Sequence, residues 1–125
     1  MIFPIDLQHF QASEFTFPDS MNVGYLRWLD RVRQRAGVPF HITNDFRPGG
    51  KGLHGLGMAV DVDSRPWRAA QKWRVMAAVA FLAHEAPGAV EFEPVYNADP
   101  KQDRHWHIGV DPRPNAVGEF VEADD

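Results

Sequence analysis

Two short segments of this 125-residue chain combine histidines with an aspartate at spacings that could hold a metal ion. In the first, His54 stands in the glycine-rich loop GLHGLG, and Asp61 follows it in the alternating stretch MAVDVD. In the second, His105 and His107 flank a tryptophan. Two imidazoles and one carboxylate are the protein ligands of one class of catalytic zinc site, which keeps a position open for water. Zinc lowers the pKa of that water and polarises a carbonyl group, so this set of residues predicts hydrolytic chemistry.

The local polarity pattern explains how these segments could meet. In residues 58–63 the apolar side chains of Met58, Val60 and Val62 alternate with Ala59, Asp61 and Asp63. We therefore expect a strand with Asp61 on the face away from the core. Residues 105–110 predict another strand, on which the two histidines share one face. The glycines around His54 permit tight turns and positive φ, so the loop can fold this histidine back over the strand. A sheet containing both strands would bring the three ligand types to one point.

Arg47 is a further candidate, because it lies in the loop NDFRPGG shortly before His54. Its guanidinium could bind a substrate carboxylate through two hydrogen bonds or stabilise an oxyanion. Asp63 shares the predicted face of Asp61, but it adjoins the start of a helix, so we expect it to cap or support that helix. The remaining histidines have no comparable context and are expected to be structural or surface residues: His9, His41 and His84.

Two main helices are predicted. The first covers about 20–36, with Asp19 or Ser20 as its N-cap, and the second runs from Ser64 to about Ala86. The inner stripe of the second helix is expected to consist of Trp67, Ala70, Trp73, Ala77, Ala80 and Phe81.

Short strands are predicted at 39–43 and 89–96, beside the two strands that carry the candidate ligands. The connections between residues 89 and 110 are short, which favours an antiparallel sheet. We therefore expect a single α+β domain over 1–125, a small mostly antiparallel sheet packed with two main helices. Residues 1–20 are expected to be an extended entry segment that docks its aromatic rings, and 112–125 a loose acidic tail.

Composition excludes several classes of function. The net charge is −4, from 13 basic and 17 acidic residues, whereas a general nucleic-acid binder is usually basic. The absence of cysteine excludes a disulfide scaffold, a cysteine-based metal site and a thiol nucleophile. No apolar run approaches the roughly 18–20 residues of a membrane-spanning helix, and no signal peptide is visible at the N-terminus. We interpret the four arginines between positions 27 and 35 as a solvated helix face, and we expect a monomer made in the cytoplasm.

The motif His-x-x-Gly-x-Ala-x-Asp at 54–61, followed by His-x-His at 105–107, resembles the zinc D-Ala-D-Ala carboxypeptidases. Relatives of that family include the vancomycin-resistance D,D-peptidases, the phage L-Ala-D-Glu endolysins and the Hedgehog amino-terminal domain. The resemblance covers about residues 9–112, including VPFHITNDFRP at 38–48. It implies a Hedgehog/DD-peptidase-like fold and a bound zinc ion, Zn²⁺.

The resemblance also implies roles for individual residues. His54, Asp61 and His107 match the three zinc ligands of the family. Arg47 matches the arginine that engages the substrate or the oxyanion, and His105 matches the first histidine of the family's His-x-His motif, with a supporting or transition-state role.

The general base is the point at which this chain departs from the family. Many members carry an acid three residues before the last ligand, where this chain has Arg104. Asp103, one residue away, is our first choice for the base. His105 is the second choice, and Glu91 or Glu93 on the preceding strand is the third.

The implied activity is cleavage of peptidoglycan stem peptides, at a D-Ala-D-Ala or an L-Ala-D-Glu bond. Such an enzyme would act on the cell wall after release by a holin or as a virion component. The displaced acid leaves an alternative, a catalytically inactive zinc-containing binding module of the same fold. A non-haem iron enzyme is disfavoured, because its usual motif places one residue between the His and Asp ligands, whereas six separate His54 from Asp61.

Overall fold

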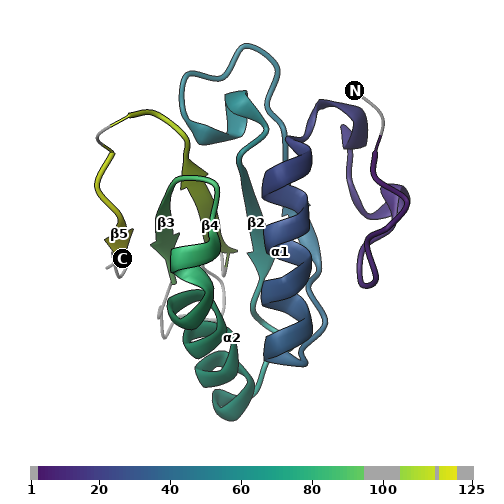
Figure 1. Cartoon of the computed structure of the whole chain (residues 1–125). Helices are drawn as coiled ribbons and strands as arrows, with labels where there is room; N and C mark the ends of the chain where they lie inside the picture. The colour runs from purple at the N-terminus through teal and green to yellow at the C-terminus, as the bar shows by residue number, and fades with distance from the viewer. Residues whose placement is uncertain (1–2, 95–104, 115, 121–125) are drawn as a thin grey trace.

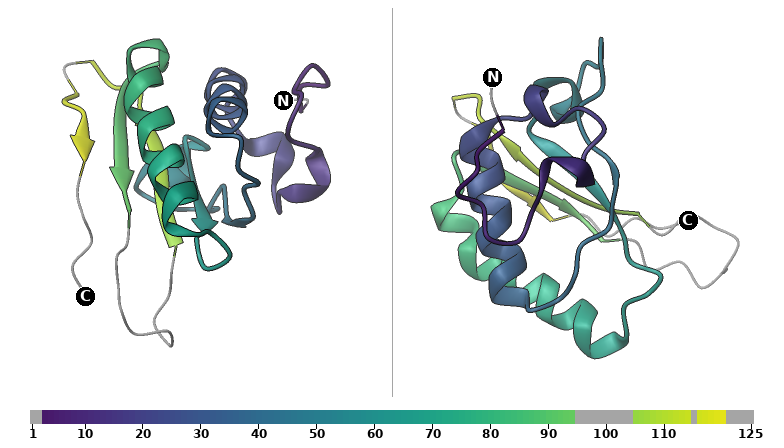
Figure 2. Two further views of the ribbon diagram at one scale, coloured as in Figure 1. Left: turned by 90° about the horizontal axis from the view of Figure 1, so that it is seen from below. Right: turned by 90° about the vertical axis from the view of Figure 1, so that its right-hand side faces the viewer.

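Two helices cover one face of a small sheet in the computed structural model, which describes residues 3–94, 105–114 and 116–120. The helices are α1 (Val23–Ala36) and α2 (Ala69–Leu82). Figure 2 shows them side by side on the same side of the strands. The predicted α+β class, with two main helices, is confirmed.

The sheet has five strands in the order β1-β2-β4-β3-β5. The pairs β1–β2, β2–β4 and β4–β3 are antiparallel, as predicted, whereas β5 pairs parallel to β3. The strands are β1 (Ile42–Asn44), β2 (Ala59–Asp63), β3 (Ala89–Glu93), β4 (His105–Asp111) and β5 (Glu119–Phe120). The prediction of a loose tail from residue 112 is wrong at β5, because backbone pairing with β3 holds that segment at the edge of the sheet (Figure 1). Residues 121–125 of the predicted tail lie outside the described residues.

Apolar and polar side chains alternate along β2 and along β4, which gives the sheet an apolar face and a polar face. Val60 pairs with Ile108 and Val62 with Trp106, and all four side chains are fully buried in the core. The residues between them point to the other face, so the predicted division of these two strands is confirmed.

Helix α1 packs its apolar side onto the sheet and ends at Gly37, which has a positive φ of 64°. The hydroxyl of Tyr25 donates a hydrogen bond of 2.6 Å to the carbonyl of Ile108, which ties the helix to β4. The predicted cap is wrong: Asn22 is the N-cap, and its side chain accepts from the backbone N–H of Tyr25 at 2.9 Å. The reason is that Pro18–Ser20 forms a separate 3-10 turn, so α1 begins later than the sequence indicates.

Helix α2 is shorter than predicted, and it presents a different face to the core. It begins after Arg68 and not at Ser64. The backbone N–H of Arg68 donates a hydrogen bond to the side-chain oxygen of Gln71. Its buried residues are Val75, Ala78, Val79 and Leu82. Trp67 is buried just before the helix, but the other residues of the predicted inner stripe are exposed: Ala70, Trp73, Ala77, Ala80 and Phe81. Both sides of α2 are apolar, so periodicity alone could not select the buried one.

The entry segment docks on the domain through aromatic rings, as predicted. Phe10 and Phe15 are buried in the core. The carboxylate of Asp45 accepts hydrogen bonds from the backbone N–H groups of Thr16 and Phe17, at 2.8 and 3.0 Å. These bonds fix the segment beside the loop that precedes the candidate metal residues.

The Asn22 cap can be tested against the predicted one. Asn22→Ala should lower the free energy of unfolding by about 1 kcal/mol, because it leaves a helix N–H without an acceptor. Ser20→Ala should change it by less than about 0.5 kcal/mol, because Ser20 is exposed outside the helix. Urea unfolding measures both values, and equal losses would contradict this assignment of the cap.

Candidate metal centre

His54, Asp61 and His107 converge on the polar face of the sheet. One ligand atom from each residue lies within 4.8 Å of the others, and all three side chains are half-buried. The Oδ1 atom of Asp61 is 3.4 Å from Nε2 of His54 and 3.3 Å from Nδ1 of His107. The predicted grouping of these residues is present in the fold, and it could hold a metal ion.

The register of β2 and β4 positions two members of the group. Asp61 lies directly opposite His107 in the antiparallel pair, so both side chains leave the sheet on the same face. Gly109, two residues further on the same face, leaves space for this arrangement, because an added Cβ would lie 3.1 Å from Nε2 of His107.

A 3-10 turn at Leu53–Leu56 carries His54 over the strand. Gly57 ends the turn with φ 67°, and an added Cβ there would collide with the carbonyl oxygen of Ser20. An added Cβ on Gly55 would collide with the backbone of Gly50. The expected role of the glycine-rich loop therefore holds at these two positions, one by positive φ and the other by close backbone approach.

Each histidine also has an oxygen atom close to its second ring nitrogen. The Nδ1 atom of His54 lies 2.9 Å from the carbonyl oxygen of Asp45, which can only accept, so Nδ1 carries the proton and Nε2 is the available ligand atom. His107 instead presents Nδ1 to Asp61, and its Nε2 lies 2.8 Å from Oε1 of Glu91, a charge contact that lacks hydrogen-bond geometry. A hydrogen bond like that of His54 fixes the orientation of a metal-binding imidazole.

Two of the three separations between ligand atoms have the length expected for tetrahedral coordination of a metal ion. Ligand bonds of about 2.0–2.1 Å in tetrahedral geometry place neighbouring ligand atoms roughly 3.3–3.4 Å apart. The two measured N···O distances from Asp61, 3.4 and 3.3 Å, have this length. They exceed the roughly 2.7–3.2 Å of a typical N–H···O hydrogen bond. The site therefore has the donor chemistry for a metal ion, and the two contacts of Asp61 have a suitable length.

Charges in the group are strongly coupled. Burial by itself would raise the pKa of Asp61, but the hydrogen bonds and charges of His107 and His54 hold this pKa well below its ordinary value. Burial likewise would lower the pKa of His107, but Asp61, with the charges of Glu91 and Glu93, raises it. Asp61 is thus ionised at neutral pH, as a metal ligand must be.

Comparisons of the chain with known proteins add no family assignment. No family model, curated protein or solved structure matches this chain.

Arg47 and His105 lie beside the group. The backbone N–H of Arg47 donates to the carbonyl of His54 at 3.0 Å, and its exposed side chain borders a pocket of about 210 Å³. Asn44 also lines this pocket and donates to Oδ2 of Asp61 at 3.2 Å, so the pocket adjoins the candidate ligands. His105 is on the same face of β4 as His107, and its Nδ1 lies 2.7 Å from Oγ1 of Thr43. Asp103, the predicted base, lies outside the described residues.

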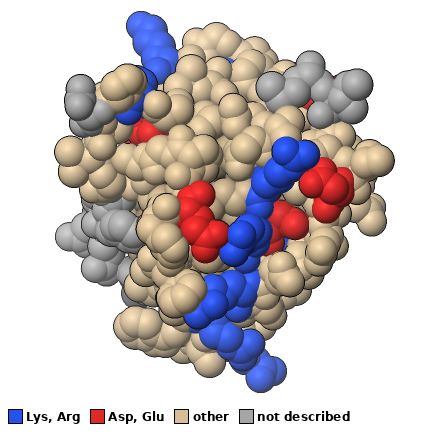
Figure 3. All heavy atoms as spheres, viewed as in Figure 1, with Lys and Arg blue, Asp and Glu red and all other residues tan. Residues whose placement is uncertain are grey.

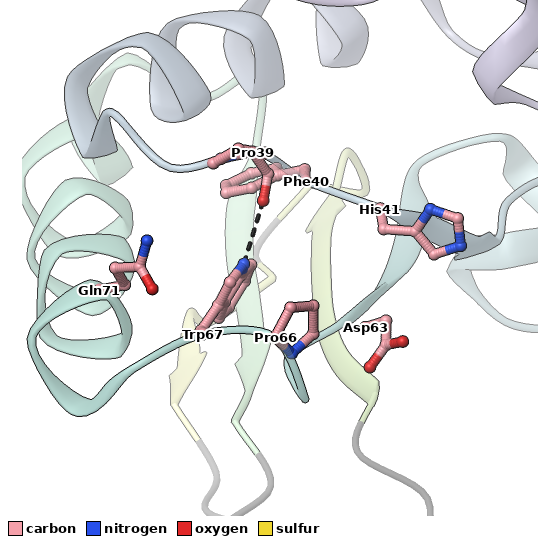
Figure 4. Close-up of a pocket in the computed structure, with 7 residues that line it drawn as sticks. All are labelled: Pro39, Phe40, His41, Asp63, Pro66, Trp67 and Gln71. Carbon is pink, nitrogen blue, oxygen red and sulfur yellow. Dashed lines mark hydrogen bonds between the residues drawn. The ribbon is translucent and has the colours of Figure 1, made fainter.

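Asp63 has a supporting role, as expected, although it stabilises a turn and does not cap α2. Its carboxylate binds the Arg65 side chain at 2.9 and 2.8 Å and accepts from the Arg65 backbone N–H. Figure 4 shows it at the end of a separate pocket of about 280 Å³, where Trp67 donates to the carbonyl of Pro39. Asp63 is therefore not part of the metal group.

Sequence reasoning assigned Glu91 only as a third choice of base, and it missed the contacts of Asn44 and Thr43. The alternation of AVEFE could have shown that Glu91 and Glu93 share the polar face, because Val90 and Phe92 are the buried residues of β3. It could not show which carboxylate reaches His107, because that depends on the pairing with β4.

Stability should depend on pH in opposite ways with and without metal. The raised pKa of His107 stabilises the metal-free fold below about pH 6.5, and this contribution is lost as the pH rises through the raised value. Metal binding requires neutral imidazoles, so the increase in Tm on adding zinc should be larger at about pH 8 than at about pH 5.5. Calorimetry at both values measures this. His107→Gln should remove both trends, and an equal zinc effect at the two pH values would contradict imidazole ligation.

The contact between Glu91 and His107 predicts a position-specific effect on metal affinity. Glu91→Gln should weaken zinc binding by about 10–100-fold, because the ring of His107 loses its anionic partner. Glu93→Gln removes the same charge from the same strand face and should have a much smaller effect. Calorimetric titration with zinc compares the two, and equal losses would show that only net charge matters.

Proposed function

We propose that this protein is a zinc-dependent peptidase that cleaves peptidoglycan stem peptides. The observation that carries the proposal is the set of His54, Asp61 and His107, with N···O separations of 3.4 and 3.3 Å around one carboxylate oxygen. The sequence resemblance to zinc D-Ala-D-Ala carboxypeptidases supplies the substrate class, and with it the Hedgehog/DD-peptidase-like fold. The location at the cell wall, as a phage lysis or virion protein, is part of the same proposal.

A bound zinc ion would supply a Lewis acid for a peptide carbonyl and would lower the pKa of water. The residues of the chain prepare the site for it. A hydrogen bond to the carbonyl of Asp45 directs Nε2 of His54 toward the centre, and the negative charge of Glu91 lies 2.8 Å from Nε2 of His107. Asn44 occupies Oδ2 of Asp61, so Oδ1 faces the two histidines. The ligands are thereby oriented before metal binds, which reduces the cost of binding.

Substrate positioning is assigned to Arg47 and the adjoining pocket. The guanidinium is exposed, and its backbone is bonded to His54, so it lies at the border of the metal group. It can hold a free carboxylate of the stem peptide through two hydrogen bonds, or stabilise the oxyanion that develops on the carbonyl. The first role suits a carboxypeptidase and the second an endopeptidase.

Proton transfer is assigned to Asp103 first and His105 second. Glu91 is the weakest candidate among the acids, because its Oε1 is engaged with Nε2 of His107. Glu93, which lies opposite His107 in the register, is the third choice. His105 is held by Thr43 through Nδ1, which orients its ring beside the ligands.

A second candidate function is a zinc-containing binding module without catalysis. It is favoured by two observations: Arg104 occupies the position of the family's acid, and Glu91 is engaged with a ligand. The two candidates share the metal and differ in hydrolysis.

The test is metal content by mass spectrometry together with hydrolysis of purified muropeptides. We expect about one zinc per chain, in keeping with a three-ligand site, and its loss in His54→Ala. The kcat/KM should fall at least about a thousandfold in that variant. His84→Ala is the matched control, because that imidazole is exposed on another part of the molecule, and it should retain both zinc and activity.

The outcomes separate the alternatives. Zinc binding without hydrolysis of any stem peptide would support the binding module. Hydrolysis that survives Asp103→Asn and falls in His105→Gln would transfer the base role to His105. Absence of stoichiometric metal from the wild type would contradict both candidate functions.

A further inference from the structure

Helix α2 presents an apolar surface to solvent on the side opposite to its buried face. Trp73 is 68% exposed and Phe81 is 55% exposed, and Ala77 lies between them on the same face. Arg74 is the single polar residue among the exposed positions of α2, which is described over its whole length. A helix on the surface of a domain normally directs polar residues to water, so this face has the composition of one that another surface covers.

Basic residues border this face. Arg35 of α1 places its guanidinium 3.5 Å from the centroid of the Phe81 ring. Arg31 of α1 lies on the same side, where it lines a surface groove with Arg35 and Leu82. Arg74 and Lys72 extend the basic border along α2. Figure 3 shows a band of Lys and Arg side chains running down the helical face of the molecule.

The distribution of charge between the helices and the rest of the chain is strongly asymmetric. Helices α1 and α2 contain six of the 13 basic residues and one of the 17 acidic residues. That acid, Asp30, is buried and accepts hydrogen bonds from the backbone N–H groups of Gln8 and His9. Within the described residues, Glu85 pairs with Arg31 and Asp6 with Arg27, but no acid pairs with Arg35, Lys72 or Arg74. The two helices thus carry an excess of basic residues, although the protein as a whole is acidic.

We propose that the surface formed by Trp73, Phe81, Arg35, Lys72 and Arg74 docks on a membrane that contains anionic lipids. Exposed aromatic rings with basic neighbours are also found in segments that lie in the plane of the membrane interface. The rings would enter the boundary between headgroups and acyl chains, and the cations would contact lipid phosphates.

The charge of the face argues against a second copy of this chain as its occupant. A symmetric contact through α2 would bring Arg35 and Arg74 near the same residues of the other copy, so like charges would repel. A planar anionic surface suits cations that are spread over two helices. This docking does not involve a membrane span, and no helix among the described residues is long and apolar enough for one.

Docking through α2 would leave the metal group accessible. Helices α1 and α2 cover the sheet face that carries Val60 and Ile108, whereas Asp61 and His107 are on the opposite face. The candidate metal centre would therefore face away from the membrane. The docking proposal does not depend on the proposed peptidase function.

Intrinsic fluorescence gives a direct test, because Trp73 is the exposed tryptophan among four. Trp28, Trp67 and Trp106 are buried, at 3%, 6% and 0% exposure. Vesicles of phosphatidylcholine with phosphatidylglycerol should shift the emission to shorter wavelength and sediment with the protein, whereas pure phosphatidylcholine vesicles should do neither. Trp73→Phe should abolish the shift but keep most of the sedimentation, since an aromatic ring remains.

Substitutions separate the apolar and the electrostatic contributions. The double variant Trp73→Ser, Phe81→Ser should bind the anionic vesicles at least about tenfold more weakly. Arg35→Glu with Arg74→Glu should have a similar effect, and high salt should weaken wild-type binding. The matched controls are Ile5→Ser, whose side chain is 98% exposed, and Lys51→Glu, which lies in an exposed loop; each should retain binding within about twofold. Circular dichroism checks that each variant is folded.

Three results would overturn the proposal. One is equal binding to neutral and anionic vesicles, or no binding to either. Another is a dimer of the wild type that dissociates in the folded Trp73→Ser, Phe81→Ser variant, which would show that a second copy covers the face. The third is a Trp73 emission shift with a single-stranded oligonucleotide and none with anionic vesicles.

Discussion

The antiparallel register of β2 and β4 is the constraint on which the rest of the structure depends. It pairs Asp61 with His107 and, one position away, Val62 with Trp106. The same pairing therefore places two candidate ligands on one face and two fully buried side chains on the other. A slip of one residue would exchange the faces, so it would bury the carboxylate and expose the tryptophan. The hydrophobic core and the candidate ligands thus require the same register.

The third candidate ligand depends on a chain of contacts that begins in the entry segment. The carboxylate of Asp45 accepts from Thr16 and Phe17, while its carbonyl oxygen contacts Nδ1 of His54. One residue thereby links the N-terminal segment to the orientation of an imidazole. Because Gly57 can take a positive φ against the carbonyl of Ser20, the loop closes tightly enough to bring that imidazole over β2.

The two faces of the molecule differ in both chemistry and charge. The polar face of the sheet gathers Asp61, Glu91 and Glu93 around His107, an arrangement that favours cations. The helical face combines exposed aromatic rings with arginines, an arrangement that favours anions and apolar surfaces. The core of the sheet separates these faces, so binding on one does not obstruct the other.

The sequence by itself determined the α+β class, the faces of β2 and β4, the end of α1 at Gly37 and the choice of candidate ligands, which are His54, Asp61 and His107. Each of these follows from local alternation, a glycine with positive φ or a motif, all of which are properties of short segments. Only the tertiary structure decided that Asn22 caps α1, that Val75 and Val79 face the core, and that the carboxylate of Glu91 lies against His107. A helix that is apolar on both sides has no preferred buried face until the sheet selects one, and a carboxylate has no assigned partner until two strands pair.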